Sequence, residues 1–289
     1  MKTGDAVHYC RASNQARTAV ARGNHGARWS VLLLMVAPLI AQPLEDRSTE
    51  HKSYAGVREL IVDNVTGFIE VSASTGGSVE MDIEKTLRAR SQDRLALARK
   101  EITLSETQQG GLVRVVVDHP SHTSSNLYEF EYNFKVKVPR SINLELRTVN
   151  KSHILVEGTS GDFRISNVNG GIEMKDVEGS GTVHTVNGGV KVTFARNPTG
   201  ATSFKSVNGT LDVAFRGGLN ADVKMKTFNG EMFTDFPVTS IPVPGQVEQT
   251  NGRYIYRNHG VTGVRIGSGG TELSFDTLNG EVLIRNREK

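Results

Sequence analysis

Residues that could carry chemistry are few and scattered in this chain. His119 and His122 lie three residues apart in a polar loop, a spacing that invites a metal-site hypothesis. No acidic residue or third histidine is placed to complete such a site, and Pro120 between the two argues against a helix. The bland interpretation, a solvated loop, is therefore preferred, and we predict no metal ligands there.

Five acidic residues in the second half of the chain are the other candidates, because paired carboxylates carry out glycoside hydrolysis. They are Asp162, Glu173, Asp176, Asp212 and Glu231. None of them recurs at one repeat position on adjacent copies of the repeat described below, and Lys191 and Lys205 are equally scattered. No Gly-x-Ser-x-Gly, His-Glu-x-x-His or phosphate-binding glycine loop is present. We predict no catalytic residues and no cofactor.

The amino terminus predicts export. Residues 1–42 carry five basic side chains and one acidic side chain, and they include an apolar run of 11 residues, Val31–Ala41. This is the pattern of a secretory signal peptide, and the run is shorter than the roughly 20 residues of a membrane span. An uncleaved anchor is the alternative. We expect a signal peptide with an extended basic region over 1–42, a loose polar lead-in over 43–56, and a location in the periplasm or at the cell surface.

Charge and cysteine usage exclude several partners. The whole chain has a net charge of +3, and removal of the +4 carried by residues 1–42 leaves −1, so nucleic acid is not expected as a partner. The single cysteine, Cys10, precedes the apolar run, so the mature chain would have no thiol for a disulfide, a metal or a nucleophile. The 30 glycines favour a turn-rich β protein.

The element that must position any site is a repeat. Asn-Gly follows an apolar residue in five copies, at Asn169, Asn187, Asn208, Asn229 and Asn279, and a degraded sixth copy has Asn150 followed by Lys151. Large apolar residues stand four places before each asparagine and three places after the asparagine of each intact copy. Five places after it stand Met174, Val192, Val213, Thr234 and Ile284. Small polar residues stand two places before it: Thr148, Asn167, Thr185, Ser206, Thr227 and Thr277. In the degraded copy Ile154 and Val156 take the later apolar roles with a shift of one.

A two-residue alternation inside a period of about 20 residues predicts strand, corner and second strand, stacked copy upon copy. The predicted fold is an all-β, single-sheet-stacked β-solenoid (β-helix) with coils of about 20 residues and one short helix, covering residues 57–289. We attribute the Asn-Gly corner to left-handed backbone angles. The polar column is expected to hydrogen-bond along the stack, with an amide ladder of asparagines beside it. A row of calcium or sugar ligands is the alternative, and Asn187→Ala should lower the melting temperature if the ladder is correct.

Three segments depart from the repeat. Residues 86–101 predict a short surface helix beginning near Ser91, for which contact with a membrane or an acidic polymer is the less favoured alternative. Residues 128–138 alternate as one long amphipathic strand. Residues 233–270 form an excursion with one strand at 254–256, where Tyr254, Tyr256 and Arg257 are the best contact candidates. A site is expected either in this excursion or in the loop at 119–127.

These residues carry a resemblance. Val138-Pro139, then Leu146, Thr148 and Asn150, and the Thr/Ser-x-Asn-Gly copies through Ile284 make residues 57–286 similar to the bacterial putative-adhesin β-strand-repeat domain, a domain of unknown function. Lys151 and the long excursion depart from its pattern. The resemblance implies a β-helical fold in secreted or cell-envelope proteins and no established catalysis.

Two classes of function remain open at the level of sequence. The first is an exported, non-catalytic adhesin or envelope scaffold that binds a surface glycan or an envelope protein, with no integral membrane span after signal cleavage. The second is a polysaccharide-active β-helix enzyme, a lyase or hydrolase. The scattered acids favour the first.

Overall fold

The computed structural model describes residues 43–120, 127–150, 152–242, 246–250, 253–257 and 261–288. The described residues all belong to one compact unit, Ala41–Lys289. The predicted signal peptide and His122 therefore lie outside the described residues.

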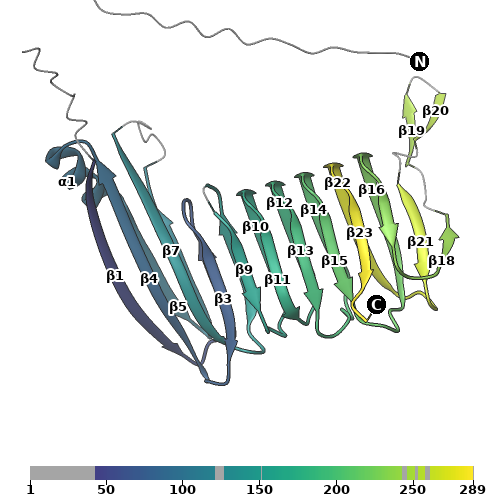
Figure 1. Cartoon of the computed structure of the whole chain (residues 1–289), viewed down its shortest axis with the longest axis horizontal. Coiled ribbons are helices and arrows are strands. Elements are labelled where there is room, and N and C mark those ends of the chain that lie inside the picture. The colour runs from purple at the N-terminus through teal and green to yellow at the C-terminus, as the bar shows by residue number, and fades with distance from the viewer. Residues whose placement is uncertain are drawn as a thin grey trace, which may run out of the picture. The chain divides into compact units, whose positions relative to one another are not determined.

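The fold is all-β, with two large mixed sheets and one helix (Figure 1). Sheet A runs in the order β1 (Leu44–Ala55), β4 (Ser78–Ala89), β7 (Tyr128–Pro139), β3 (Ile69–Ser74), β9 (Ile154–Glu157), β11 (Ile172–Val177), β13 (Val190–Phe194), β15 (Leu211–Phe215), β23 (Val282–Asn286) and β17 (Met232–Thr234). Sheet B runs in the order β18 (Val238–Ile241), β21 (Thr262–Ile266), β16 (Ala221–Asn229), β22 (Thr271–Asn279), β14 (Thr202–Asn208), β12 (Gly181–Asn187), β10 (Phe163–Asn169), β8 (Asn143–Thr148), β2 (Glu59–Asp63), β6 (Leu112–Asp118) and β5 (Thr103–Gln109).

Each copy of the repeat gives one strand to each sheet, because the Asn-Gly corner turns the chain from sheet B into sheet A. The prediction of a single stacked sheet was wrong for this reason. The apolar column four places before asparagine lies in register across parallel strands, in the order Leu146, Ile165, Val183, Phe204, Phe275 and Met225. The predicted shift in the degraded copy is confirmed, since Ile154 pairs with Ile172 and Val156 with Met174.

The copies do not follow one another in sequence order. β22 lies between β14 and β16, and β23 lies between β15 and β17, so the Asn279 copy separates the Asn208 and Asn229 copies. The 50 residues between Asn229 and Asn279 are thus the path by which the chain leaves the stack and returns one layer earlier. Figure 1 shows this as the yellow β23 beside the green β15.

Apolar side chains from both sheets fill the space between them. Phe194 and Phe215 stack with ring centroids 5.1 Å apart, and Phe204 and Phe275 do the same at 5.1 Å. All four side chains are buried. The core therefore continues from copy to copy, as expected for units that cannot bury their apolar faces alone.

The amino-terminal part of the described chain differs from the prediction. Residues 44–55, expected to be a loose lead-in, form the 12-residue strand β1, which pairs antiparallel with β4 along its whole length. β1 lies at a sheet edge, where polar residues are tolerated, so its polar composition did not indicate a strand. The predicted helix is confirmed as α1 (Gln92–Glu101). Ser91 is its N-cap, and Leu95 and Ala98 are its buried residues.

The excursion at 233–270 is more regular than its prolines suggested. β18 and β21 pair antiparallel, and β21 pairs antiparallel with β16, so both extend sheet B. The strand predicted at 254–256 is found as β20 (Arg253–Arg257), paired with β19 (Gln246–Thr250) in a separate hairpin. Nothing further can be assigned to the contact candidates Tyr254, Tyr256 and Arg257, whose side chains lie outside the described part.

Candidate functional site

The side chains of the polar column form hydrogen bonds inside the structure. The hydroxyl of Thr185 donates to the carbonyl oxygen of Gly170 at 2.9 Å, and that of Ser206 donates to Gly188 at 3.0 Å. Thr148, Thr277 and Thr227 donate in the same way to Gly67, Gly209 and Gly280. The prediction of a column that bonds along the stack is confirmed, and these hydroxyls are already engaged within the chain.

The asparagines of the repeat form the expected amide ladder. Asn187 Nδ2 donates to Asn169 Oδ1 at 2.9 Å and Asn208 Nδ2 donates to Asn187 Oδ1 at 2.8 Å. The same bond joins Asn169 to Asn150, Asn279 to Asn208, and Asn229 to Asn279. The ladder therefore runs unbroken through all six copies.

The prediction that the Asn-Gly corner adopts left-handed backbone angles was wrong. None of the five repeat asparagines has a positive φ, and Gly170, Gly188, Gly209 and Gly230 have none either. Instead, a Cβ on Gly188 would lie 2.3 Å from the carbonyl oxygen of Gly170, and one on Gly209 would lie 2.0 Å from that of Gly188. Glycine is required because the backbones of neighbouring copies approach closely at this corner.

The acidic candidates are held apart. In sheet A, Lys191 pairs between Glu173 and Asp212, and its Nζ lies 3.7 Å from Glu173. Asp212 accepts a 2.6 Å bond from Arg285. Asp162 accepts from the backbone nitrogen of Ser180 at the other corner, where Asn143 and Ser180 make equivalent bonds to the next copy. The fold brings no two of these acids side by side on one face.

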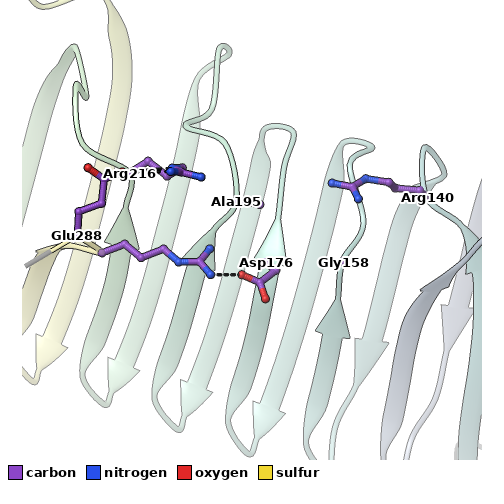
Figure 2. A pocket seen from close by; sticks show the side chains of 7 residues that line it. Arg140, Gly158, Asp176, Ala195, Arg216 and Glu288 are labelled. Atoms are coloured by element: carbon purple, nitrogen blue, oxygen red, sulfur yellow. Dashed lines mark hydrogen bonds and ion pairs between the residues drawn. The ribbon is translucent and has the colours of Figure 1, made fainter.

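Asp176 lines a hollow together with three arginines (Figure 2). The hollow has a volume of about 430 Å³ and follows the corners at which sheet A strands end. We call it the corner hollow. Its lining residues are Arg140, Gly158, Asp176, Ala195, Arg216, Arg287 and Glu288. Figure 2 shows Arg140, Asp176 and Arg216 projecting from separate corners along one row.

Arg287 crosses three copies to reach this row. Its backbone nitrogen donates to Phe215 at 2.8 Å, its Nη1 donates to the Phe194 carbonyl at 3.1 Å, and its Nη2 lies 2.5 Å from Asp176 Oδ1. These partners belong to the three copies that precede β23 in the stack. Arg287 is therefore a strap that holds the end of the chain against the corners.

Asp176 is the single non-glycine residue with positive φ, at 51°, in the described part of the chain. The pairing of β11 with β13 shifts between Met174 and Val177, so Asp176 sits in a β-bulge. Bulges re-aim side chains next to functional sites, and aspartate tolerates the left-handed region better than most residues. Here the bulge turns the carboxylate toward Arg287.

Arg140 and Arg216 are the more available cations of the corner hollow. Arg216 lies 3.2 Å from Glu288, and Arg140 lies 2.8 Å from Glu178. Both side chains are more than half exposed, at 54% and 58%. A planar guanidinium fits carboxylates with two parallel bonds, so this row can hold an acidic ligand. The two carboxylates of the corner hollow, Asp176 and Glu288, are paired with Arg287 and Arg216.

A second hollow of about 430 Å³ lies beside it at the start of the sheet B strands, around Glu145, Asp162, Arg164 and Ser180. Its one arginine is bound by Glu145 at 3.0 Å. Because its polar groups serve the corner bonds described above, it offers less to a ligand than the corner hollow does.

Sequence reasoning missed the corner hollow, although one signal was present. Arginine stands eight residues after Asn208 and after Asn279, at Arg216 and Arg287. The signal is weak because the out-of-order copy makes these two corners neighbours only in space. The expectation of a site in the loop at 119–127 or in the excursion stays a prediction. His119 lies at the described end of its loop, with its ring centroid 6.0 Å from that of Phe130 and the two rings tilted by 30°.

No group of three His, Cys, Asp or Glu side chains among the described residues is arranged to hold a metal ion. No helix in the part that the structure covers has the length and apolar character to cross a membrane.

No protein-family model matches the chain, and no curated protein matches it. Solved structures match at low identity. A putative cell adhesion protein from Clostridium sporogenes is 9% identical, with 84% of this chain and 100% of that chain covered and a TM-score of 0.43. A putative adhesin from Bacteroides fragilis is 10% identical, with 85% and 99% covered and a TM-score of 0.32. A putative lipid binding protein from Parabacteroides distasonis is 11% identical, with 83% and 96% covered and a TM-score of 0.25.

Bacterial proteins named as putative adhesins are thus among the structural neighbours, in agreement with the resemblance found in the sequence. At these TM-scores the likeness says nothing about ligands.

Proposed function

We propose that the chain is an exported, non-catalytic β-solenoid module of the bacterial cell envelope that binds a carboxylate-bearing surface glycan at the corner hollow. The observation that carries the proposal is the row of Arg140, Arg216 and Arg287 around a polar hollow of about 430 Å³. The parallel, in-register copies between β8 and β16 support a solenoid core.

A binding role follows from how the polar groups are used. The repeat hydroxyls and amides bond within the stack, and Glu173 and Asp212 are paired with basic side chains. Arg216 is held by an exposed ion pair with Glu288, which is worth about 0–1 kcal/mol. Arg140 pairs with Glu178, whose side chain is 14% exposed and also lies 3.8 Å from Arg196. A ligand carboxylate can replace the Glu288 pair at little cost, and Glu178 keeps Arg196 as a cation when Arg140 binds the ligand.

The test is binding of the exported chain to purified acidic and neutral polysaccharides, measured by titration at two salt concentrations. We expect binding to the acidic polymers, weaker at high salt. Arg140→Ala combined with Arg216→Ala should reduce affinity about tenfold or more, since hydrogen bonds to charged groups contribute roughly 1.5–3 kcal/mol each.

Arg164→Ala is the matched control, because Arg164 is also an exposed arginine with one acidic partner but lies outside the corner hollow. Equal binding to neutral polymers, or equal affinity in the double variant, would refute the proposed site. Turnover of any polymer that is lost in Asp212→Asn or Glu173→Gln would instead support the alternative of a polysaccharide-active enzyme.

A further inference from the structure

The two ends of the stack are finished differently. At the β1 end, Lys52 of sheet A lies 3.2 Å from Glu106 of sheet B, and Arg99 of α1 lies 2.6 Å from Asp46. β1 itself carries charged side chains along its length. Charged edge strands and bridging ion pairs disfavour the addition of another strand, so this end is protected.

The opposite end has an unpaired edge. β21 pairs with β16 only from Ala221 to Met225, although β16 continues to Asn229. β17 pairs on one side only, with β23. No strand within the described ranges lies on the outer side of residues 226–234, called the free edge below.

The inward-facing side chains of the free edge are less buried than the equivalent side chains of the neighbouring copy. Thr227, Met232 and Thr234 are half-buried. Their counterparts in the neighbouring copy, Thr277, Val282 and Ile284, are 2%, 0% and 1% exposed. On the outer faces, Phe228 is 77% exposed and Phe233 is 48% exposed. The copies between Asn169 and Asn208 have valine or charged residues at these two positions.

The free edge also presents the acceptors that each inner copy offers to the next. Gly280 accepts from the Thr227 hydroxyl at 3.0 Å, and Asn279 Oδ1 accepts from Asn229 Nδ2 at 2.6 Å. One layer further, the corresponding acceptors are the Gly230 carbonyl and Asn229 Oδ1. A strand with a hydroxyl residue two places before an asparagine would satisfy both.

The chain itself shows that such an edge accepts a segment that is distant in sequence. β22 and β23 reach their place beside β14 and β15 only after the excursion at 233–270. The order of copies in the stack is therefore set by matching edges and not by chain continuity, so an edge can also be completed by another molecule.

We propose that the free edge is an interaction surface that binds an extended polypeptide segment of a partner protein by β-strand addition. The partner segment carries Thr or Ser opposite Gly230, Asn opposite Asn229, and apolar residues beside Phe228 and Phe233. Backbone bonds supply affinity in this mode, and alternate side chains supply specificity. This surface is separate from the corner hollow and does not depend on the proposed function.

The test uses a labelled synthetic peptide with the sequence of Thr271–Ile284, which contains Thr277 and Asn279 in the required spacing and has Leu278 and Leu283 at the positions beside Phe228 and Phe233. Its binding to the full chain is measured by fluorescence anisotropy, and hydrogen exchange locates the contact. We expect saturable binding with slowed exchange within 226–234, and an affinity at least about tenfold lower for a peptide with alanine in place of Thr277 and Asn279.

Phe228→Ser should weaken binding by a similar factor, while Val168→Ser, which changes the same column in the middle of the stack, should leave it unchanged. Phe228 is 77% exposed, so its replacement leaves the fold intact. No binding, equal binding of the alanine peptide, or protection outside 226–234 would overturn the proposal. A dimer of the chain that Phe228→Ser abolishes, without peptide binding, would overturn it in favour of a second copy.

Discussion

Gly188 allows two copies to approach because it lacks a side chain. The Cβ of an alanine there would lie 2.3 Å from the Gly170 carbonyl oxygen, a backbone atom that cannot move aside alone. We expect Gly188→Ala to lower the free energy of unfolding by about 1–3 kcal/mol, the usual cost of overpacking. Gly77→Ala is the control, because nothing lies within 4 Å of its added carbon. Equal melting temperatures for the two variants would contradict the close-approach explanation.

Thr185 contributes to the stack through its hydroxyl rather than its shape. Thr185→Val keeps the volume but removes the 2.9 Å donor to Gly170 at a buried position. A lost partner for a buried polar group costs about 1–3 kcal/mol, which chemical denaturation can measure. Thr193→Val, on the outer face of sheet A, should change stability little. If both variants unfold alike, the polar column is not internal support.

At the scale of elements, β23 and the strap that follows it close the out-of-order copy onto the stack. Arg287→Ala removes contacts to Phe194 and Asp176 at once. We expect a loss of about 1–3 kcal/mol in thermal or chemical unfolding, because the guanidinium bonds to a carboxylate and to a backbone carbonyl. Arg47→Ala, which breaks two exposed ion pairs on β4 and β1, should cost less. The reverse order would show that the strap is not structural.

Buried tyrosines at the β1 end predict that the protein loses stability at alkaline pH. Burial raises the pKa of Tyr132 to about 12 and that of Tyr128 to about 12, and burial with the Glu106 hydrogen bond raises the pKa of Tyr54 further. A raised folded pKa gives stability that is complete below the unfolded value of about 10 and is lost as pH rises through the folded value. The free energy of unfolding should therefore fall between about pH 10 and pH 12.

Tyr132→Phe should lose stability less steeply than the unchanged chain over this interval, as measured by denaturation at stepped pH. Burial lowers the pKa of Lys85, which acts with the opposite sign, since its contribution grows as pH rises toward the ordinary lysine value. Identical pH profiles for the two proteins would contradict the assignment of the effect to Tyr132.

At the scale of the whole molecule, the repeat predicted the register well. Identical residue types at one depth could only stack in parallel, so the columns through Val183, Thr185 and Asn187 were readable from periodicity alone. The helix after Ser91 was readable from its cap and its helix-forming residues. The helix depends on local sequence, and the columns recur in every copy of the repeat, so both could be predicted.

What the sequence could not show depends on single, non-local events. Insertion of β22 and β23 one layer early leaves no mark in the pattern except a spacing of 50 residues. β1 is polar because it lies at an edge, which resembles a lead-in. The corner hollow draws Arg140, Arg216 and Arg287 from copies far apart in the chain, so no motif joins them before the fold does.

The measurement that most directly tests the account compares Asn187→Ala with the Arg140→Ala, Arg216→Ala double variant in both thermal unfolding and acidic-glycan binding. Asn187 supports the stack internally, whereas Arg140 and Arg216 are the proposed ligand contacts. We therefore predict that Asn187→Ala lowers the melting temperature and keeps its affinity, while the double variant keeps its melting temperature and binds about tenfold more weakly or worse. An Asn187→Ala protein of unchanged stability that no longer binds, beside a double variant that still does, would contradict this prediction.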